Sequence, residues 1–343
     1  MNPNVAIIIV NWNGWQDTLE CLESLYQINY SNYDVVLVDN NSEDDSIQKI
    51  KEYCNGQIRV ESKFFQYQTQ NKPIKIIEYT EKEGKINQNV SNNDKNTYQA
   101  PLIKKLILIK TDKNHGFAGG NNIGIKYAIH YLNPDYVLLL NNDTVQDQEF
   151  LVELVKTAES SNHIGFVGAK TYFYNKENTI QVAGGANVSF KYIISLEVGL
   201  NQVDNGSYDQ NTELDYIGGS CVLCKVEMIK KIGLMDTKYF MYWEDADWGF
   251  RGSKAGYKSV YSFKSKIWHK VGASSKSHFQ EYYFNRNRMY FMKKNRKNLD
   301  YIKFLAYFFT SLFWHESHEL LINKRDLKGF KIYFKALLNG IFT

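Results

Sequence analysis

The chain has 343 residues, of which 43% are hydrophobic and 23% charged, and its formal net charge is +4. This composition is that of a globular protein with a large core, and it excludes an intrinsically disordered chain. The small net charge gives no reason to expect a nucleic-acid partner, and we predict none. Four cysteines are too few for a disulfide scaffold and indicate a reducing compartment, so we expect a cytoplasmic protein.

Short apolar runs alternate with amphipathic segments in the first part of the chain. The runs Val5–Val10 and Val35–Val38 predict buried strands. Apolar residues repeat at helical spacing from Trp15 to about Ile28, and a second helix is expected to end near Cys54. The order strand, helix, strand, helix predicts a parallel sheet with right-handed crossovers. No basic segment followed by an apolar core opens the chain, so we expect no signal peptide.

Residues 56–105 interrupt this alternation with a polar segment rich in Asn, Gln and Lys. We interpret the segment as an insertion that forms a small hairpin and then a mobile loop, because its second half, 81–99, has almost no apolar residues. Surface decoration is the expected role, and acceptor binding is the alternative.

The sheet resumes at Leu106–Ile109, and a glycine-rich segment, 114–124, then leads into a helix expected at about Gly120–Tyr131. Glycines that open a helix let a phosphate or a ribose approach the backbone, although their spacing does not match GxGxxG. The apolar run Tyr136–Leu140 stops at Asn141-Asn-Asp143. A carboxylate beyond a buried strand lies where open α/β sheets bind ligands, and an ordinary turn is the alternative.

The second half of the chain has short predicted strands with glycine-rich turns, which indicate antiparallel additions to the sheet. Cys221 and Cys224 have CxxC spacing but no second pair, so a buried strand is expected there rather than a metal site. The segment Trp243–Trp248 places three acids at a predicted helix start between two tryptophans. Tryptophan side chains on either side would raise the pKa of a carboxylate and prepare it for base chemistry. The alternative role for these acids is to cap the helix. His269 lies just past another predicted strand.

The last part of the chain, 282–343, is basic and aromatic and predicts a helical extension of a main domain formed by residues 1–281. The run Ile302–Trp314 is too short to span a bilayer but suits a helix that lies at its surface. We therefore predict peripheral contact with the inner face of the cell membrane, with helices packed on the main domain as the alternative. No apolar run is long enough for a transmembrane helix.

Acids at three predicted strand ends, the opening Asn11-Trp-Asn13 and the glycine-rich segment together resemble family 2 glycosyltransferases of the GT-A fold. The similarity is to the branch of rhamnosyltransferases and galactofuranosyltransferases, and it covers roughly residues 5–55 and 106–295. It implies an α/β fold: a mostly parallel sheet flanked by helices, with antiparallel additions and a C-terminal helical extension. It further implies an inverting enzyme that moves a sugar from a dTDP- or UDP-sugar to a glycan or a lipid-linked acceptor.

The resemblance also implies roles for particular residues. The catalytic base would be Asp245, with Glu244 beside it, and the donor would be bound through Mn²⁺ or Mg²⁺ held by Asp143 and His269. The residues expected around the nucleotide are Val10, Asn11, Asn13, Asp39, Asn121 and Asn141. Asn141 departs from the family's DxD motif, because an amide can bond a ribose hydroxyl but removes one metal ligand.

The sequence leaves open the roles of two residues and two other classes of function. Asn122 could touch the donor or cap its helix, and Arg251 could contact the diphosphate or pair with Glu244. A sugar nucleotidyltransferase would usually need a cationic glycine-rich loop after the first strand, which Asn11–Gly14 does not provide. A catalytically inactive sugar-nucleotide-binding protein is the other alternative, and the intact acids argue against it.

Overall fold

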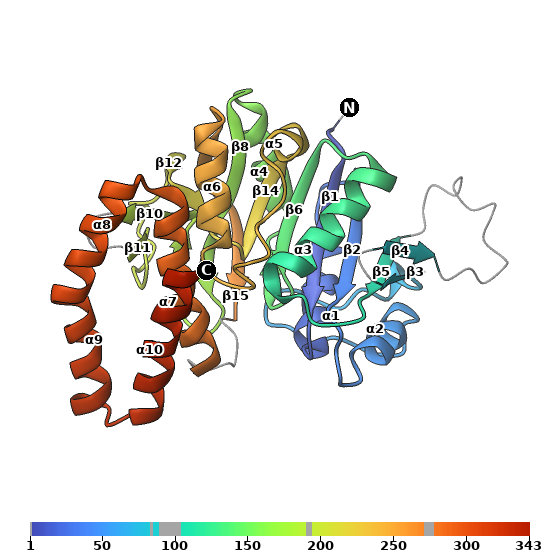
Figure 1. Ribbon diagram of the computed structural model, residues 1–343. Coiled ribbons are helices and arrows are strands. Elements are labelled where there is room, and N and C mark those ends of the chain that lie inside the picture. Colours follow the sequence, from blue (N-terminus) through green and yellow to red (C-terminus); the bar gives the residue numbers. More distant parts are fainter. Residues whose placement is uncertain (1, 83–84, 89–103, 190–193, 271–277) are drawn as a thin grey trace.

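The computed structural model of the chain describes residues 2–82, 85–88, 104–189, 194–270 and 278–343. A twisted mixed sheet forms its centre, with helices on both faces (Figure 1). The strands of this sheet lie in the spatial order β12 (Thr212–Leu214), β15 (Lys258–His269), β8 (Ile164–Phe173), β14 (Cys221–Lys225), β6 (Tyr136–Asn141), β1 (Val5–Asn11), β2 (Tyr33–Asp39), β5 (Lys105–Lys110), β3 (Lys75–Lys82) and β4 (Lys85–Gln88).

Parallel pairing dominates the middle of the sheet. Strand β1 lies parallel to both β2 and β6, and β5 lies parallel to both β2 and β3. Strand β14 is antiparallel to its neighbours β6 and β8, and two short strands, β7 (Thr144–Gln146) and β9 (Ile180–Ala183), add antiparallel pairs to β15 and β8. A small second sheet contains β10 (Gly185–Ser189), β11 (Ile194–Glu197) and β13 (Tyr216–Ile217). The predicted fold is confirmed.

The sheet is buried on both faces, which explains the continuous apolar runs of its central strands. On one face, Ile7 and Ile9 of β1 join a core with α1 (Trp15–Leu25), α2 (Ser46–Cys54) and α4 (Phe150–Glu159). On the other face, Ile8 joins a core with α3 (Gly116–Tyr127), α5 (Val226–Ile232) and α6 (Glu244–Lys254). Cys221 and Cys224 are buried free thiols in β14, as the sequence predicted.

Helix α3 begins at Gly116, four residues before its predicted start. Gly116 has a φ of +69°, which turns the chain from the preceding loop into the helix. A Cβ at Gly124 would lie 2.4 Å from Cγ2 of Ile8, and a Cβ at Gly120 would lie 3.0 Å from Cγ1 of Val10. These two glycines therefore let α3 lie close against β1, a packing role that their sequence pattern did not distinguish from ligand binding.

The C-terminal residues form a helical lobe beside α6 (Figure 1). It comprises α7 (His278–Asn295), a long helical segment containing α8 (Asn298–Tyr307) and α9 (Phe313–His318), and α10 (Leu327–Phe342). Its buried core includes Phe291, Phe308 and Leu337 and continues onto Trp243 of the main domain. The predicted helical extension is thus packed on the domain. Within the described ranges, no helix is both long and apolar enough to cross a bilayer.

The polar insertion contributes to the main sheet. Its predicted hairpin is formed by β3 and β4, and β3 extends the sheet by pairing with β5. Residues 83–84 and 89–103, most of the predicted mobile loop, lie outside the described residues.

A buried ion pair links the first half of the insertion to α1. Lys72 Nζ lies 2.8 Å from Oε2 of Glu23, with only 6% and 0% of the two side chains exposed. The Tyr53 hydroxyl and the Gln68 backbone N–H also donate to the Glu23 carboxylate. Burial would raise the pKa of Glu23, but these donors and the lysine charge outweigh it, so the pKa is lowered. The ionised carboxylate therefore stabilises the folded chain.

Replacing Lys72 by Ala should leave the Glu23 charge buried without its cation. We expect the free energy of unfolding to fall by about 3 kcal/mol or more, measured by urea denaturation at pH 7. Because the pKa of Glu23 is lowered on folding, the stabilisation exists above its unfolded-state pKa. It is lost as the pH falls through the folded value, so the difference from wild type should shrink below about pH 4.3. Lys49→Ala, which breaks the more exposed Lys49–Glu52 pair, should cost at most about 1 kcal/mol. Equal losses for the two variants would contradict the anchoring role of Lys72.

Candidate active site

Parallel pairing brings the polar residues that follow several strands to one edge of the sheet. In the register of β1, Asn11 lies opposite Asp39 of β2, and Val10 lies opposite Asn141 of β6. The next strand, β14, runs antiparallel, so the turn before it reaches the same edge. There the Asn141 N–H donates to the carbonyl of Ser220 at 2.9 Å. Residues distant in sequence thus lie close together at the carboxyl edge, where α/β sheets bind ligands.

Asp39 is held firmly at this edge. Its carboxylate accepts hydrogen bonds from Asn11 Nδ2 at 2.9 Å, from Ser42 Oγ at 2.6 Å and from Ser42 N at 3.1 Å. The Asn13 N–H donates to the same serine hydroxyl at 3.0 Å, and Asn13 itself has a φ of +51°. Ser42 is therefore the residue that joins Asn13 to Asp39.

The side chains of residues 141–143, at the end of β6, alternate between two sides of the chain. The middle residue, Asn142, points back to α1 and donates to Thr18 Oγ1 at 2.9 Å. Asn141 and Asp143 face the end of β15, where His269 Nε2 lies 3.5 Å from Asn141 Nδ2 and 3.0 Å from Asp143 Oδ1. Burial would raise the pKa of Asp143, but the hydrogen bond and charge of His269 outweigh it, so the pKa is lowered. The structure thus brings the two predicted metal ligands into contact.

The second nitrogen of His269 is also engaged. Nδ1 lies 2.9 Å from Oε1 of Gln181 in β9, and a carboxamide oxygen only accepts hydrogen bonds, so Nδ1 carries a proton. Nε2 is therefore the nitrogen that faces Asp143, and it is the one that would bind a cation shared with that carboxylate. This arrangement fits a metal-binding histidine with an outer hydrogen-bond partner. No motif surrounds Gln181 in β9, so the sequence did not indicate this role.

A second group of potential metal ligands lies elsewhere. Glu81 of β3, Asp112 and His115 place their ligand atoms within 4.8 Å of one another, at the adjoining ends of β3 and β5. His115 Nε2 is 3.2 Å from Glu81 and 3.7 Å from Asp112. Asp143 and His269 are not part of this group. As a pair they supply two ligands, and a bound diphosphate would have to supply others.

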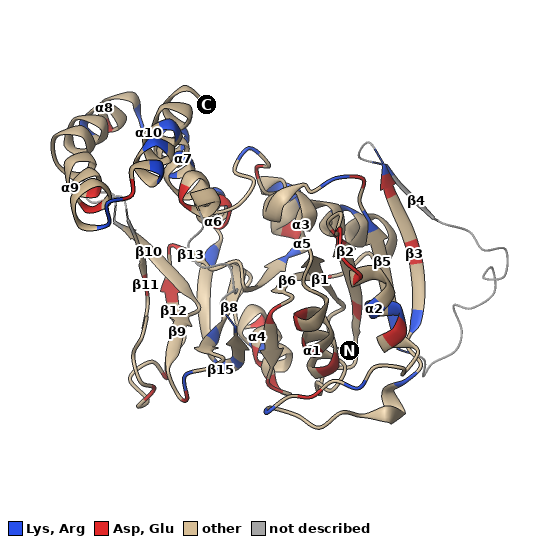
Figure 2. Cartoon of the chain, turned by 90° about the horizontal axis from the view of Figure 1, so that it is seen from below, with Lys and Arg blue, Asp and Glu red and all other residues tan. Residues whose placement is uncertain are grey.

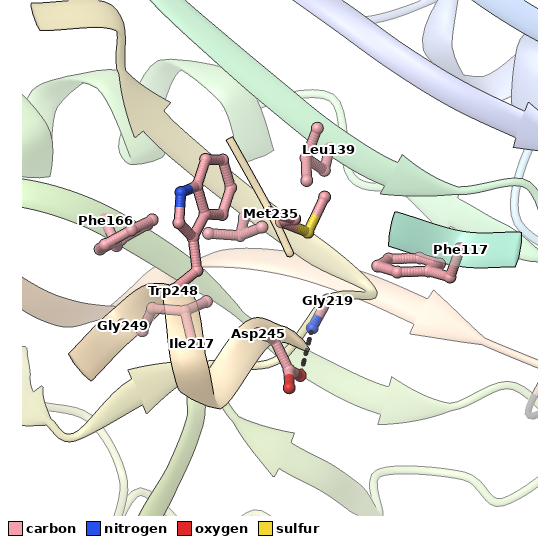
Figure 3. A pocket seen from close by; sticks show the side chains of 10 residues that line it. Phe117, Leu139, Phe166, Ile217, Gly219, Met235, Asp245, Trp248 and Gly249 are labelled. Carbon is pink, nitrogen blue, oxygen red and sulfur yellow. Dashed lines mark hydrogen bonds between the residues drawn. The ribbon is translucent and has the colours of Figure 1, made fainter. Parts of the chain in front are cut away.

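Asp245 stands at the start of α6, above a small apolar cavity. Figure 3 shows its carboxylate beside Gly219, with Phe117, Met235 and Trp248 lining the cavity. Asp245 Oδ2 accepts from the Gly219 N–H at 3.3 Å, and Oδ1 accepts from the Ala246 N–H at 2.8 Å. Burial raises the pKa of Asp245 to about 6, although both N–H donors act in the opposite direction. Gly219 immediately precedes Ser220, so Asp245 lies over the same edge as Asn141.

The neighbouring charges of α6 have different surroundings. Glu244 is buried, its Oε2 has no hydrogen-bond partner among the described residues, and burial together with the Asp245 charge holds its pKa well above the ordinary value. Asp247 is buried but fully paired, at 2.9 Å from Arg251 and 3.0 Å from Lys294. The Arg251 guanidinium also donates to the carbonyls of Ile232 and Leu234. The carboxylate that pairs with Arg251 is thus Asp247 and not Glu244.

The asparagines of α3 also have internal partners. Asn121 Nδ2 donates to the Phe117 carbonyl of its own helix at 2.9 Å. Asn122 exchanges two hydrogen bonds with the backbone of Met235 and so joins α3 to the segment before α6. These contacts are structural, and the Asn122 pair was not among the roles expected from the sequence.

Comparison with protein families identifies the chain. Residues 6–89 match the model of glycosyl transferase family 2, and residues 93–291, more than half of the chain, match the model of glycosyltransferase-like family 2. The chain belongs to glycosyltransferase family 2. Its relatives support the rhamnosyltransferase-like branch predicted from the sequence.

Two characterised relatives of this glycosyltransferase show the extent of the similarity. The low-salt glycan biosynthesis hexosyltransferase Agl10 of Haloferax volcanii is 27% identical over 146 residues, 43% of this chain and 46% of the relative. Rhamnosyltransferase WbbL of Escherichia coli K12 is 27% identical over 154 residues, 43% of this chain and 58% of the relative. The matches thus span about half the length of these relatives.

Solved structures share the fold at low sequence identity. The mannosyltransferase PcManGT of Pyrobaculum calidifontis, in complex with GDP-Man and Mn²⁺, aligns with a TM-score of 0.55 at 13% identity, covering 98% of this chain and 75% of the other. TarS 1–349 of S. aureus, in complex with UDP-GlcNAc, aligns with a TM-score of 0.55 at 14% identity, covering 98% and 80%. These neighbours are GT-A glycosyltransferases, and the chain has that fold.

The raised pKa of Asp245 predicts an unusual effect on stability. The folded protein binds the Asp245 proton more tightly than the unfolded chain, so ionisation lowers stability as the pH rises from about 4 to about 6. Asp245→Asn avoids this loss. Its Tm should exceed that of wild type by about 2 °C or more at pH 8, and the two values should converge at pH 4.

Glu227→Gln, which alters an exposed first-turn acid of α5, is the matched control and should show no such gain. A helix-capping role for Asp245 predicts the reverse, since loss of an acid near a helix N-terminus destabilises. A lower Tm for Asp245→Asn at pH 8 would therefore contradict the assignment.

Proposed function

We propose that this glycosyltransferase transfers a sugar, with inversion, from a dTDP- or UDP-sugar to a hydroxyl group of a glycan or a lipid-linked acceptor. Relatives that are named as rhamnosyltransferases, one of them acting on N-acetylglucosaminyl-diphospho-decaprenol, support this donor and acceptor chemistry. We also propose a role in surface polysaccharide or glycan assembly, which the similarity to a hexosyltransferase named for glycan biosynthesis supports. The match covers only part of those relatives, so the proposal rests mainly on the site.

The observation that carries the proposal is the environment of Asp245. A carboxyl group with a pKa near 6 is ionised at neutral pH and remains basic enough to take a proton from a hydroxyl. In the proposed step the acceptor oxygen forms a bond to the anomeric carbon and its proton passes to Asp245. The bond from that carbon to the diphosphate breaks, and its electron pair leaves with the diphosphate. A single displacement of this kind inverts the anomeric configuration.

Glu244 differs from Asp245 in this proposal. Its deeper burial favours the protonated acid, so Glu244 shapes the environment of Asp245 and does not compete for the acceptor proton. Two neighbouring carboxyl groups with separated pKa values can thus take different roles.

The other side of the site would hold the donor. Asp39, with Asn11, Asn13 and the Val10 backbone, is proposed to bind the nucleotide base, and Asn141 to bind the ribose. Asp143 Oδ1 and His269 Nε2 would hold a divalent cation, for which a mixed oxygen and nitrogen set suits Mn²⁺ and also permits Mg²⁺. Such a cation offsets the charge that develops on the departing diphosphate. Asn121 faces its own helix, which makes it the least supported member of the predicted donor site.

The test is sugar transfer by Asp245→Asn and Asp143→Ala beside wild type. A panel of dTDP- and UDP-sugars with Mn²⁺ and a lipid-linked acceptor would be read out as released nucleoside diphosphate. We expect Asp245→Asn to lower kcat by about 10²- to 10⁴-fold, because proton removal is lost. Asp143→Ala should mainly raise the Mn²⁺ concentration that is required. Glu227→Gln serves as the control with unchanged transfer.

Full transfer by both variants would refute the mechanism. Release of pyrophosphate from a nucleoside triphosphate and a sugar phosphate would instead indicate a nucleotidyltransferase. Calorimetric binding of a nucleotide sugar with neither transfer nor hydrolysis would indicate a binding protein.

We further propose that the C-terminal lobe lies on the inner face of the cell membrane. Large apolar side chains are exposed along it, among them Trp314 at 65%, Ile322 at 61% and Phe342 at 81%. Basic residues accompany them on α10 and in the turn before it (Figure 2). Helices that combine apolar and basic surface bind at the interface of anionic bilayers. Such a position would bring the site to a lipid-linked acceptor.

Vesicle flotation tests this position. Wild type should float with vesicles that contain phosphatidylglycerol, and a triple variant, Trp314→Ser, Ile322→Ser and Phe342→Ser, should stay in the soluble fraction. Point changes are preferable to deletion of residues 300–343, because Phe304 and Leu337 within that range belong to the buried core of the lobe. Val203→Ser, at an exposed apolar residue outside the lobe, is the matched control. Undiminished flotation of the triple variant would refute the membrane contact.

A further inference from the structure

The segment that leads into Asp245 has an unfavourable backbone. Phe240, Tyr242 and Trp243 have φ values of +65°, +68° and +72° and are all bulky side chains, which rarely adopt this left-handed conformation. Trp243 is directly followed by Glu244 and Asp245 at the start of α6. We call residues 239–243 the aromatic loop. Because three left-handed residues in one short loop persist only where the surroundings impose them, something must hold this loop.

Asn287 of α7 makes the contacts that can do so. Its side chain is fully buried, and its Nδ2 lies 2.7 Å from the carbonyl oxygen of Tyr239, 2.7 Å from that of Met241 and 2.9 Å from that of Tyr242. Two amide hydrogens are thus shared among three converging carbonyls of the aromatic loop. Asparagine is a poor residue for the interior of a helix. Its presence in α7 is explained by these contacts across to the loop.

Neighbouring residues of α7 hold the flanks of the loop. Arg286 donates to the Lys238 carbonyl, and the Tyr290 hydroxyl donates to Asp236 at 2.9 Å. Lys294 bridges Asp236 at 2.8 Å and Asp247 of α6 at 3.0 Å. Helix α7 therefore contacts the chain on both sides of Glu244 and Asp245, and Asn287 acts at the strained part itself.

We propose that Asn287 is a positioning residue for Asp245: by holding the aromatic loop in its left-handed conformation, it fixes the start of α6 so that Asp245 faces the sheet edge. The inference rests on the proposed role of Asp245 as the base. Asn287 touches neither the donor residues nor the reacting atoms, so its effect would be on turnover and not on nucleotide binding.

The test uses Asn287→Ala, which removes the donor, and Asn287→Ser, which keeps one hydroxyl donor and changes the site less. Each is assayed well below its own Tm. We expect kcat for transfer to fall about 10- to 100-fold, which is the range for a misplaced catalytic group. The affinity for UDP or dTDP with Mn²⁺, measured by calorimetry, should be unchanged. Asn339→Ala, which removes an exposed hydrogen bond between α10 and Tyr282 of α7, is the control and should behave as wild type.

A second readout requires no substrate. The titration of the Asp245 carboxyl can be followed by ¹³C NMR, with Asp245→Asn identifying its signal. Among the described residues, Asp245 interacts electrostatically with Glu244 on its own helix, Glu197 of β11 and Tyr216 of β13, and Asp247 in turn acts on Glu244. These are unchanged in the Asn287 variants. Release of the aromatic loop should expose Asp245 to water, so its midpoint should move from about 6 toward lower pH.

The outcomes separate this inference from the proposed function. Wild-type kcat and an unchanged Asp245 midpoint in both Asn287 variants would overturn the positioning role. A parallel loss of kcat and nucleotide affinity with an unchanged midpoint would also overturn it, because that result indicates a general structural role. Full activity of Asp245→Asn would refute the proposed base, whereas an inactive Asp245→Asn beside fully active Asn287 variants would refute only the inference about Asn287.

Discussion

The hydrogen-bonded register of β1 with β2 and β6 is the constraint on which the rest of the molecule depends. It sets Asn11 opposite Asp39, and Asn141 opposite the preceding residue Val10, at the carboxyl edge of the sheet. A shift of one residue in either pairing would turn the side chains of that strand to the opposite face. The packing of α3 on β1 opposes such a shift, because a Cβ at Gly124 would lie 2.4 Å from Ile8 and one at Gly120 would lie 3.0 Å from Val10, so each glycine is matched to the side chain beneath it. The hydrophobic core therefore fixes the geometry of the site.

The pKa values of two carboxyl groups at this edge shift in opposite directions because their surroundings differ. Asp143 is next to an imidazole that favours its ionised form, and Asp245 sits over apolar side chains that favour its neutral form. This difference in environment supports the roles proposed for the two groups, charge stabilisation for Asp143 and proton transfer for Asp245. It follows from the strand directions: β15 runs parallel to β8, in the direction of β6, and supplies His269 at its carboxyl end, whereas the turn before the antiparallel strand β14 supplies Gly219.

The sequence predicted the parts of this arrangement that depend on local pattern. Continuous apolar runs identified β1, β2 and β6, and the abrupt change to polar residues identified Asp39 and Asp143. Contacts between distant segments had no such signal. Gln181 contacts His269, and Gly219 contacts Asp245, only because the fold places β9 and the turn before β14 at the carboxyl edge. Arg251 pairs with Asp247, one turn away on the same helix. The glycines of α3 show the same limit, because close packing on β1 and an approach by phosphate require the same residue type.

The central position of β1 also has a consequence for how the chain is made. Val5 pairs with Tyr136, so β1 is synthesised well before β6, the strand that covers its second edge. In that interval a run of six β-branched or small apolar residues presents an open strand edge, the kind of segment that joins to copies of itself. Pairing between such distant segments is slow. Until β6 is in place, the uncovered edge of Val5–Val10 is therefore the part of the nascent protein at which we expect aggregation to begin.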